Sequence, residues 1–139
     1  MKKYIILALV LLSVFSMLTM VVVALQNPLR KSEENISYYL LKTIPLGTDM
    51  REAIQIIEGK DEWKIRWVDE EDGFVVGPYG PDTGRAHDGY RGVGEKSMRV
   101  YLGYYYKYFF IQTDVSAFFA FDENSKLIEI AIDKSMNVL

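Results

Sequence analysis

The 139-residue chain contains no cysteine, and this absence excludes several ways of stabilising or attaching a small domain. Disulfide bonds and thiolate metal sites both require cysteine, so the folded part must be held together by packing. A lipid-anchored lipoprotein is excluded as well, because it needs a thiol at the first residue of the mature chain. Ten tyrosines, seven phenylalanines and two tryptophans supply side chains for that packing.

Histidine is nearly absent too, and patterns typical of enzymes are missing. His87 is the single histidine and therefore the only candidate base for a serine nucleophile. The acidic run 69–72 predicts a solvated turn, in which all four carboxylates contact water and the pKa differences that acid–base catalysis needs are not expected. No glycine-flanked turn of the kind that exposes a nucleophile surrounds Ser97, Ser116, Ser125 or Ser135. We therefore expect no enzymatic activity and no catalytic residues.

The sequence also matches no known pattern for a metal site or a phosphate-binding site. Asp82, Thr83, His87 and Asp88 offer oxygen and nitrogen atoms, but their spacing matches neither an EF-hand nor a zinc pattern. The run 89–94 is rich in glycine, yet strand-like residues follow it where a dinucleotide-binding loop needs a helix. We expect no metal and no cofactor.

Basic residues are scarce beyond the first 31 positions. Residues 32–139 hold 12 Lys and Arg, which is the chain's 16 less Lys2, Lys3, Arg30 and Lys31, against all 19 Asp and Glu. The resulting net charge of −7 predicts repulsion from nucleic acid and from anionic lipid surfaces. Nucleic acid is therefore not an expected partner.

The most prominent feature present is an uncharged apolar run from Tyr4 to Leu25. As a helix rising about 1.5 Å per residue, it extends roughly 33 Å, enough to cross a hydrocarbon core of about 30 Å. Its length favours a retained signal anchor over a secretion signal, although a cut after Ala24 is the alternative and would release the rest. We expect residues 1–26 to cross the cytoplasmic membrane once, with the N-terminus inside. A linker, 27–31, then leads to an extracytoplasmic domain, 32–139.

Two short helices are expected at the start of this domain. Ser32 can cap the first, whose apolar positions include Ile36 and Leu40, and Pro45 ends it. In the second, Asp49 or the threonine before it provides the cap. Its apolar residues recur at helical spacing, and the glycine at position 59 stops it; these residues are Met50, Ala53, Ile54 and Ile57.

The remainder of the domain alternates with a period of two, which is typical of strands. Trp63, Ile65 and Trp67 predict one strand, and 74–76 its hairpin partner across the acidic turn. A third strand is expected over 98–105, and a last hairpin pairs 115–121 with 126–133. The predicted fold is therefore α+β: a membrane helix, then two short helices packed on an antiparallel meander of four to five strands. This two-layer sandwich would keep one sheet face wet.

Two segments are candidates for contact with a partner. The glycine-rich stretch 77–95 predicts a long exposed loop, whose Arg85, His87 and Arg91 could contact a ligand. An aromatic cluster provides Tyr101, Tyr104, Tyr106 and Tyr108. Alternation buries only about half of its rings, which leaves the others for a protein or glycan partner, or for the membrane interface.

Two further segments resemble a known family. Residues 44–50, Ile-Pro-Leu-Gly-Thr-Asp-Met, are similar to the turn that opens the second helix of BamE-like (SmpA/OmlA) domains. Residues 121–128, Phe-Asp-Glu-Asn-Ser-Lys-Leu-Ile, resemble the Phe-Asp-x-x-Gly-(Lys/Arg)-Leu hairpin near the end of those domains. The resemblance implies a small extracytoplasmic scaffold or adaptor without an active site. Because the lipoprotein cysteine is missing and a helical anchor is expected in its place, a role in outer-membrane barrel assembly does not carry over. The stretch 77–95 is also larger than the family pattern requires.

These observations together predict a membrane-tethered interaction module of the bacterial cell envelope, which binds another envelope protein. The alternative is a ligand-sensing or inhibitor module that uses 77–95. A cell-wall hydrolase has only its location and scattered carboxylates in its favour.

Overall fold

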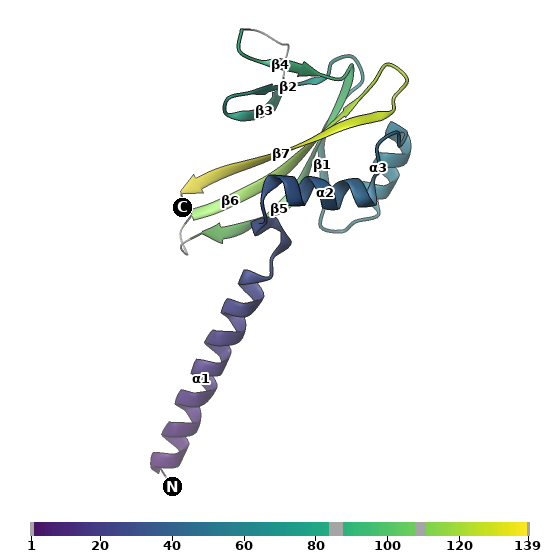
Figure 1. Ribbon diagram of the computed structural model, residues 1–139. Helices are drawn as coiled ribbons and strands as arrows, with labels where there is room; N and C mark the ends of the chain where they lie inside the picture. The colour runs from purple at the N-terminus through teal and green to yellow at the C-terminus, as the bar shows by residue number, and fades with distance from the viewer. Residues whose placement is uncertain (1, 84–87, 108–110, 139) are drawn as a thin grey trace.

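The computed structural model describes residues 2–83, 88–107 and 111–138. A long helix, α1 (Lys2–Leu25), projects from a folded domain that holds all other elements (Figure 1). It is exposed along its length and is long and apolar enough to cross a membrane. A short 3-10 turn, η1 (Pro28–Arg30), joins it to the domain.

The two predicted helices form where their caps indicate. Helix α2 (Glu33–Thr43) begins after Ser32, whose hydroxyl accepts a hydrogen bond from the Asn35 amide. Helix α3 (Met50–Glu58) begins after Asp49, whose carboxylate accepts one from the Arg51 amide. That backbone hydrogen bond lowers the pKa of Asp49, because it stabilises the charged carboxylate.

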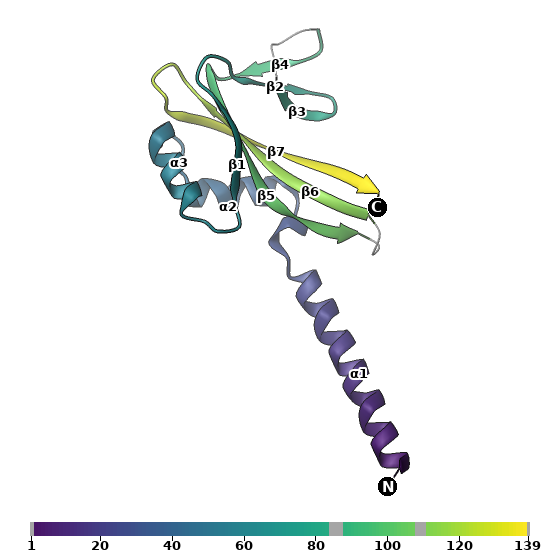
Figure 2. The ribbon, with the colours of Figure 1, turned by 180° about the vertical axis from the view of Figure 1, so that it is seen from behind.

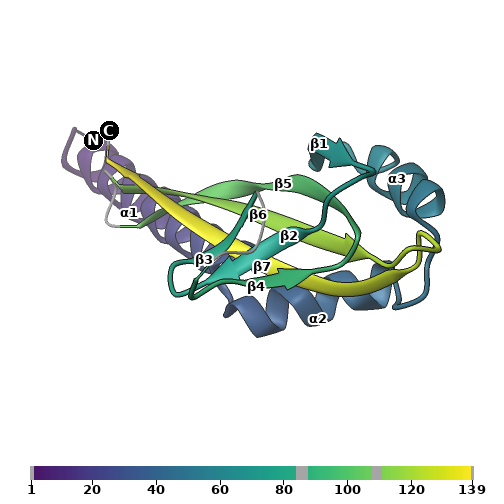
Figure 3. The ribbon, with the colours of Figure 1, turned by 90° about the horizontal axis from the view of Figure 1, so that it is seen from above.

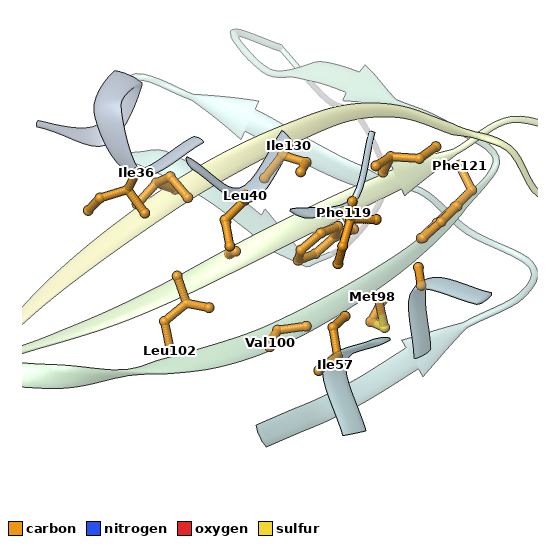
Figure 4. Packing of buried hydrophobic residues seen from close by; sticks show 14 of the residues in the cluster. Ile36, Leu40, Ile57, Met98, Val100, Leu102, Phe119, Phe121 and Ile130 are labelled. Carbon is orange, nitrogen blue, oxygen red and sulfur yellow. The ribbon is translucent and has the colours of Figure 1, made fainter. Parts of the chain in front are cut away.

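A four-stranded antiparallel sheet lies against these helices. Its strands are β1 (Lys64–Asp69), β5 (Lys96–Lys107), β6 (Ile111–Phe121) and β7 (Leu127–Val138), in the order β1-β5-β6-β7. Apolar side chains from both layers meet between them, and Figure 4 shows Leu40 and Ile57 of the helices facing Phe119 of the sheet. This confirms the α+β class and the predicted last hairpin.

The prediction for 74–95 was wrong in two respects. Strand β2 (Phe74–Gly77) does not pair with β1; it lies between β3 (Gly80–Thr83) and β4 (Arg91–Val93) in a separate three-stranded sheet. The stretch expected to be a loop therefore contributes two strands. Strand β1 instead pairs with β5, which lies about thirty residues further along the chain.

This small sheet covers one end of the larger sheet, on the face opposite the helices (Figure 3). Phe74 and Val93 of the small sheet pack there on Phe118 and Ala120 of β6. The domain thus has three layers at this end, and β6 is buried without interruption from Val115 to Phe121. The expected wet face is confined to the other half of the sheet.

A β-bulge in β1 explains a further wrong prediction. Trp63, Ile65 and Trp67 were expected on one face, but the register with β5 shifts between Ile65 and Trp67. Ile65 packs with the helices, whereas Trp67 turns to the opposite face and meets Phe118 edge-on, with ring centroids 6.1 Å apart. The extra residue of a bulge inverts the alternation that follows it.

Candidate partner-binding face

Three of the tyrosines predicted to bind a partner lie on one face of the sheet. Strict alternation would place Tyr101 opposite Tyr104 and Tyr106, but the pairing of β5 with β6 shifts between Tyr101 and Gly103. Gly103 has a φ of 130°, a value that side chains rarely allow. The bulge brings the three tyrosines together on the face away from the helices, and we call this surface the tyrosine face.

The outer tyrosines are open to solvent and contact each other. Tyr104 is 48% exposed and Tyr106 is 41% exposed. Their ring centroids lie 5.5 Å apart at an interplanar angle of 81°, an edge-to-face arrangement. Such a pair presents a large, rigid surface of the kind found at protein interfaces.

Asp114 of β6 organises the polar groups beside these rings. Its Oδ1 accepts hydrogen bonds from the Tyr101 hydroxyl at 3.2 Å and from the Gln112 amide at 2.8 Å. Its Oδ2 accepts one from the Asn137 amide at 2.8 Å. Burial raises the pKa of Tyr101, and the negative charge of Asp114 raises it further, so the phenol remains a donor at neutral pH.

Two arginines complete the tyrosine face. The Arg66 guanidinium lies 4.8 Å from the centroid of the Tyr101 ring, and that of Arg99 lies 5.1 Å from Phe118. Arg99 also pairs with Asp133 at 3.6 Å, while its buried Nε finds no hydrogen-bond partner among the described residues. A depression of about 280 Å³ is lined by Arg66, Arg99, Tyr101, Asp114, Ser116 and Ser135.

The linker binds the edge of β5, the strand that carries Tyr104 and Tyr106. Asn27 donates a hydrogen bond to the Tyr104 carbonyl at 3.4 Å, and the Arg30 guanidinium donates to the Tyr106 carbonyl. Leu29 packs against the main core. Strand β1 ends its pairing with β5 at Tyr101, so the linker occupies the part of the β5 edge that β1 leaves open. Figure 2 shows the end of α1 close to the ends of β5 and β6.

The second predicted site is only partly described. Arg91 lies on β4 and forms a bidentate pair with Glu129 of β7, at 3.2 and 2.8 Å, at the end of the large sheet that the small sheet covers. This pair attaches the small sheet to the larger one. Arg85, His87 and Tyr108 lie outside the described residues.

The polar residues that β6 contributes to the tyrosine face were not predicted from the sequence. Gln112, Asp114 and Ser116 alternate along β6 and pair with outward-facing residues of β5 and β7. Their period of two was a usable signal, but the strand was expected to begin only at Val115. The prediction therefore omitted Asp114, which organises the network.

The two segments that resemble BamE-like domains contact each other. The Gly47 amide donates to the Leu127 carbonyl at 2.8 Å, and the Met50 amide donates to the Ser125 carbonyl at 2.9 Å. Lys126 lies 3.5 Å from the Asp49 carboxylate. A second depression, of about 300 Å³, adjoins this junction, between the start of α3 and the β6–β7 turn.

Ser125 stands where the family's hairpin pattern has glycine. Its φ is 61°, in the left-handed region, and no other described residue except glycine has a positive φ. The backbone of this turn thus has the conformation that glycine adopts most easily.

A scan against family models and searches of curated proteins and solved structures find no match for this chain. The likeness to BamE-like domains remains a prediction from residues 44–50 and 121–128. The function of this protein must therefore be inferred from its apolar helix α1 and its surfaces.

Proposed function

We propose that this protein is a membrane-tethered, extracytoplasmic protein-interaction module of the bacterial cell envelope. In this proposal α1 is the retained anchor, and the tyrosine face binds another envelope protein. The observation that carries the proposal is the gathering of Tyr101, Tyr104 and Tyr106 beside the linker.

The chemistry of this face suits a protein partner. Tyrosine and arginine are the residues most enriched among those that dominate binding energy, together with tryptophan. Here their backbones belong to a sheet, and the Asp114 network restrains the Tyr101 side chain, so little conformational entropy is lost when a partner binds. The depression on this face is lined by Tyr101 and by side chains of both charge signs, Arg66, Arg99 and Asp114.

The anchor supports the same proposal. Helix α1 is uncharged from Tyr4 onward and long enough to span a bilayer, and the linker that follows is bound to β5 at two carbonyls. A tether attached in this way presents the tyrosine face at a limited range of heights and angles. A partner in the same membrane would meet it in a restricted orientation, which raises the effective concentration of the two surfaces.

Site-specific photo-crosslinking in cells tests the proposal. A photoreactive phenylalanine analogue replaces Tyr104 in the full chain, and a matched control replaces Tyr79, which is 94% exposed in the turn between β2 and β3. We expect one discrete heavier adduct from position 104 and none of that mass from position 79.

A charge reversal shows whether the adduct reports a specific surface. Arg66 is exposed and lies over Tyr101, so Arg66→Glu alters the tyrosine face without removing core contacts. The adduct should decrease strongly in this variant. Recovery of monomer alone at position 104, or equal adducts at 104 and 79, would contradict the proposal.

A further inference from the structure

The end of β5, the start of β6 and the end of β7 lie side by side, and we call them the strand ends. They have two chemically different faces. Tyr104 and Tyr106 belong to the tyrosine face, whereas the intervening Tyr105 packs against the main core on the helix side. Residues paired across strands share a face, so Lys107 and Met136 also belong to the helix side. This side is the one next to η1 and α1.

Positive charge is concentrated on that side. The Arg30 guanidinium lies 5.4 Å from the Tyr105 ring centroid, and Lys134 lies 5.6 Å from it. Lys134 also donates a hydrogen bond to the Lys31 carbonyl. With Lys107 these residues make four cations, and Met136 beside them is 66% exposed. We call Arg30, Lys31, Lys107, Lys134 and Met136 the anchor-side surface.

Acidic residues of the same strand ends lie on the other face. Asp114 and Asp133 belong to the tyrosine face, where they bind Tyr101 and Arg99. Glu33 and Glu34 begin α2 and are the acids nearest in sequence to the linker cations. The four cations thus outnumber these two acids, although residues 32–139, which do not include Arg30 and Lys31, carry −7 in total.

The position of the anchor-side surface is set by the anchor. Asn27, only two residues after the end of α1, is bonded to the Tyr104 carbonyl. If α1 crosses a bilayer, the strand ends therefore lie at the height of the headgroups, and Figures 1 and 2 both show them beside the end of α1. Charges separated by more than a Debye length of about 8–10 Å are screened, so acids elsewhere in the domain act weakly there, and Asp133 is paired with Arg99.

We propose that the anchor-side surface binds anionic phospholipid headgroups of the leaflet in which α1 ends. The cations contact the phosphates, and Met136 enters the boundary with the acyl chains. The domain is then held against the membrane with the tyrosine face turned away from it. This inference rests on the proposed retention of α1, and it adds a lipid partner to the protein partner proposed above.

The absence of cysteine allows a direct measurement of depth. Met136→Cys gives the full chain a unique site for a spin label, and Tyr79→Cys on the small sheet is the matched control. Each protein, with residues 1–25 verified by mass spectrometry, is placed in nanodiscs of phosphatidylcholine alone or mixed with phosphatidylglycerol. Collision with oxygen and with an aqueous nickel complex reports the depth of the label.

We expect the label at 136 to be shielded from nickel in anionic nanodiscs and to be less shielded in neutral ones. The label at 79 should be accessible in both. Lys107→Gln should lower the ratio of immersed to exposed label about fivefold, which is the contribution of one cation near an anionic surface. Arg51→Gln, an equal charge change on α3, should leave that ratio unchanged.

Three results would overturn the inference. The first is equal nickel access at 136 and 79, and the second is equal immersion in neutral and anionic nanodiscs. The third is an equal effect of the Lys107 and Arg51 variants. Since the nanodiscs contain no envelope protein that could be the partner, failure here leaves the crosslinking test at Tyr104 unaffected, and failure of the crosslink leaves the lipid measurement valid.

Discussion

Phe118 provides the sharpest test of how the small sheet is attached. It is 1% exposed, and its ring lies 5.5 Å from that of Phe74 and 6.1 Å from that of Trp67. The Arg99 guanidinium covers it at 5.1 Å. Phe118→Ala removes the central side chain between the two sheets, so it should detach the small sheet.

The expected cost follows from this burial. Replacing a buried phenylalanine by alanine destabilises a protein by about 3–5 kcal/mol, including the ring contacts that are lost. A domain of this size has a total stability of about 5–15 kcal/mol, so the variant should still fold. With a urea slope of about 1.5 kcal/mol/M, a loss of about 4 kcal/mol lowers the unfolding midpoint by about 2–3 M.

Tryptophan fluorescence can report on this cluster alone. In a Trp63→Phe background, the remaining Trp67 lies beside Phe118, so its emission should shift to longer wavelength when the small sheet separates. Phe119→Ala is the matched control, because Phe119 is equally buried but faces the helices. Both variants should be destabilised in urea, measured on the full chain in nanodiscs.

Amide hydrogen exchange then distinguishes loosening of the small sheet in Phe118→Ala from loosening of the helices in Phe119→Ala. In Phe118→Ala, amides of β2 and β4 should exchange faster than global unfolding explains, while in Phe119→Ala those of α2 should do so. A loss below about 1 kcal/mol for Phe118→Ala, or the same exchange pattern in both variants, would refute the reasoning.

The other predictions concern single residues. Gly103→Ala should cost about 1–3 kcal/mol in urea unfolding, because its φ of 130° strains any side chain. Ser125→Gly should raise the free energy of unfolding by up to about 1 kcal/mol, because glycine adopts the positive φ of this position without strain. Loss of the 2.8 Å hydrogen bond from Lys96 to the Ser125 hydroxyl reduces this gain. The pKa of Tyr101 is raised above 10.0, so its stabilising contribution is complete below that pH and is lost as pH rises through the folded-state pKa. Tyr101→Phe, which cannot ionise beside Asp114, should therefore lose less stability than the parent above pH 10, as measured by urea midpoints.

Local features of the chain were predicted well. Ser32 and Asp49 cap the helices that they were expected to cap, and the turn at 122–125 joins the strands on either side of it. The apolar run forms one continuous helix. In each case the deciding interactions join residues only a few positions apart, so they can be recognised in the sequence.

Pairing between distant residues was predicted poorly. The acidic run at 69–72, between two strand-like segments, suggested a hairpin. It does form a turn, in which Asp69 accepts hydrogen bonds from the Glu71 and Asp72 amides. These hydrogen bonds also lower the pKa of Asp69. A turn, however, does not specify which strands pair, and β2 joins β3 and β4 instead. Its partners are chosen by the burial of Phe74 and Val93 on β6.

The sequence by itself determined the apolar helix, the two capped helices, the alternating strands and the absence of cysteine chemistry. Tertiary structure decided which face each residue occupies. One extra residue at each of two bulges turned Trp67 toward the small sheet and brought Tyr101, Tyr104 and Tyr106 together. Bulges form where packing across the sheet outweighs regular pairing, and docking of the linker depends on contacts between residues about eighty positions apart. Such contacts leave no periodic signal in the chain, so only the folded domain reveals the two faces proposed to bind protein and lipid.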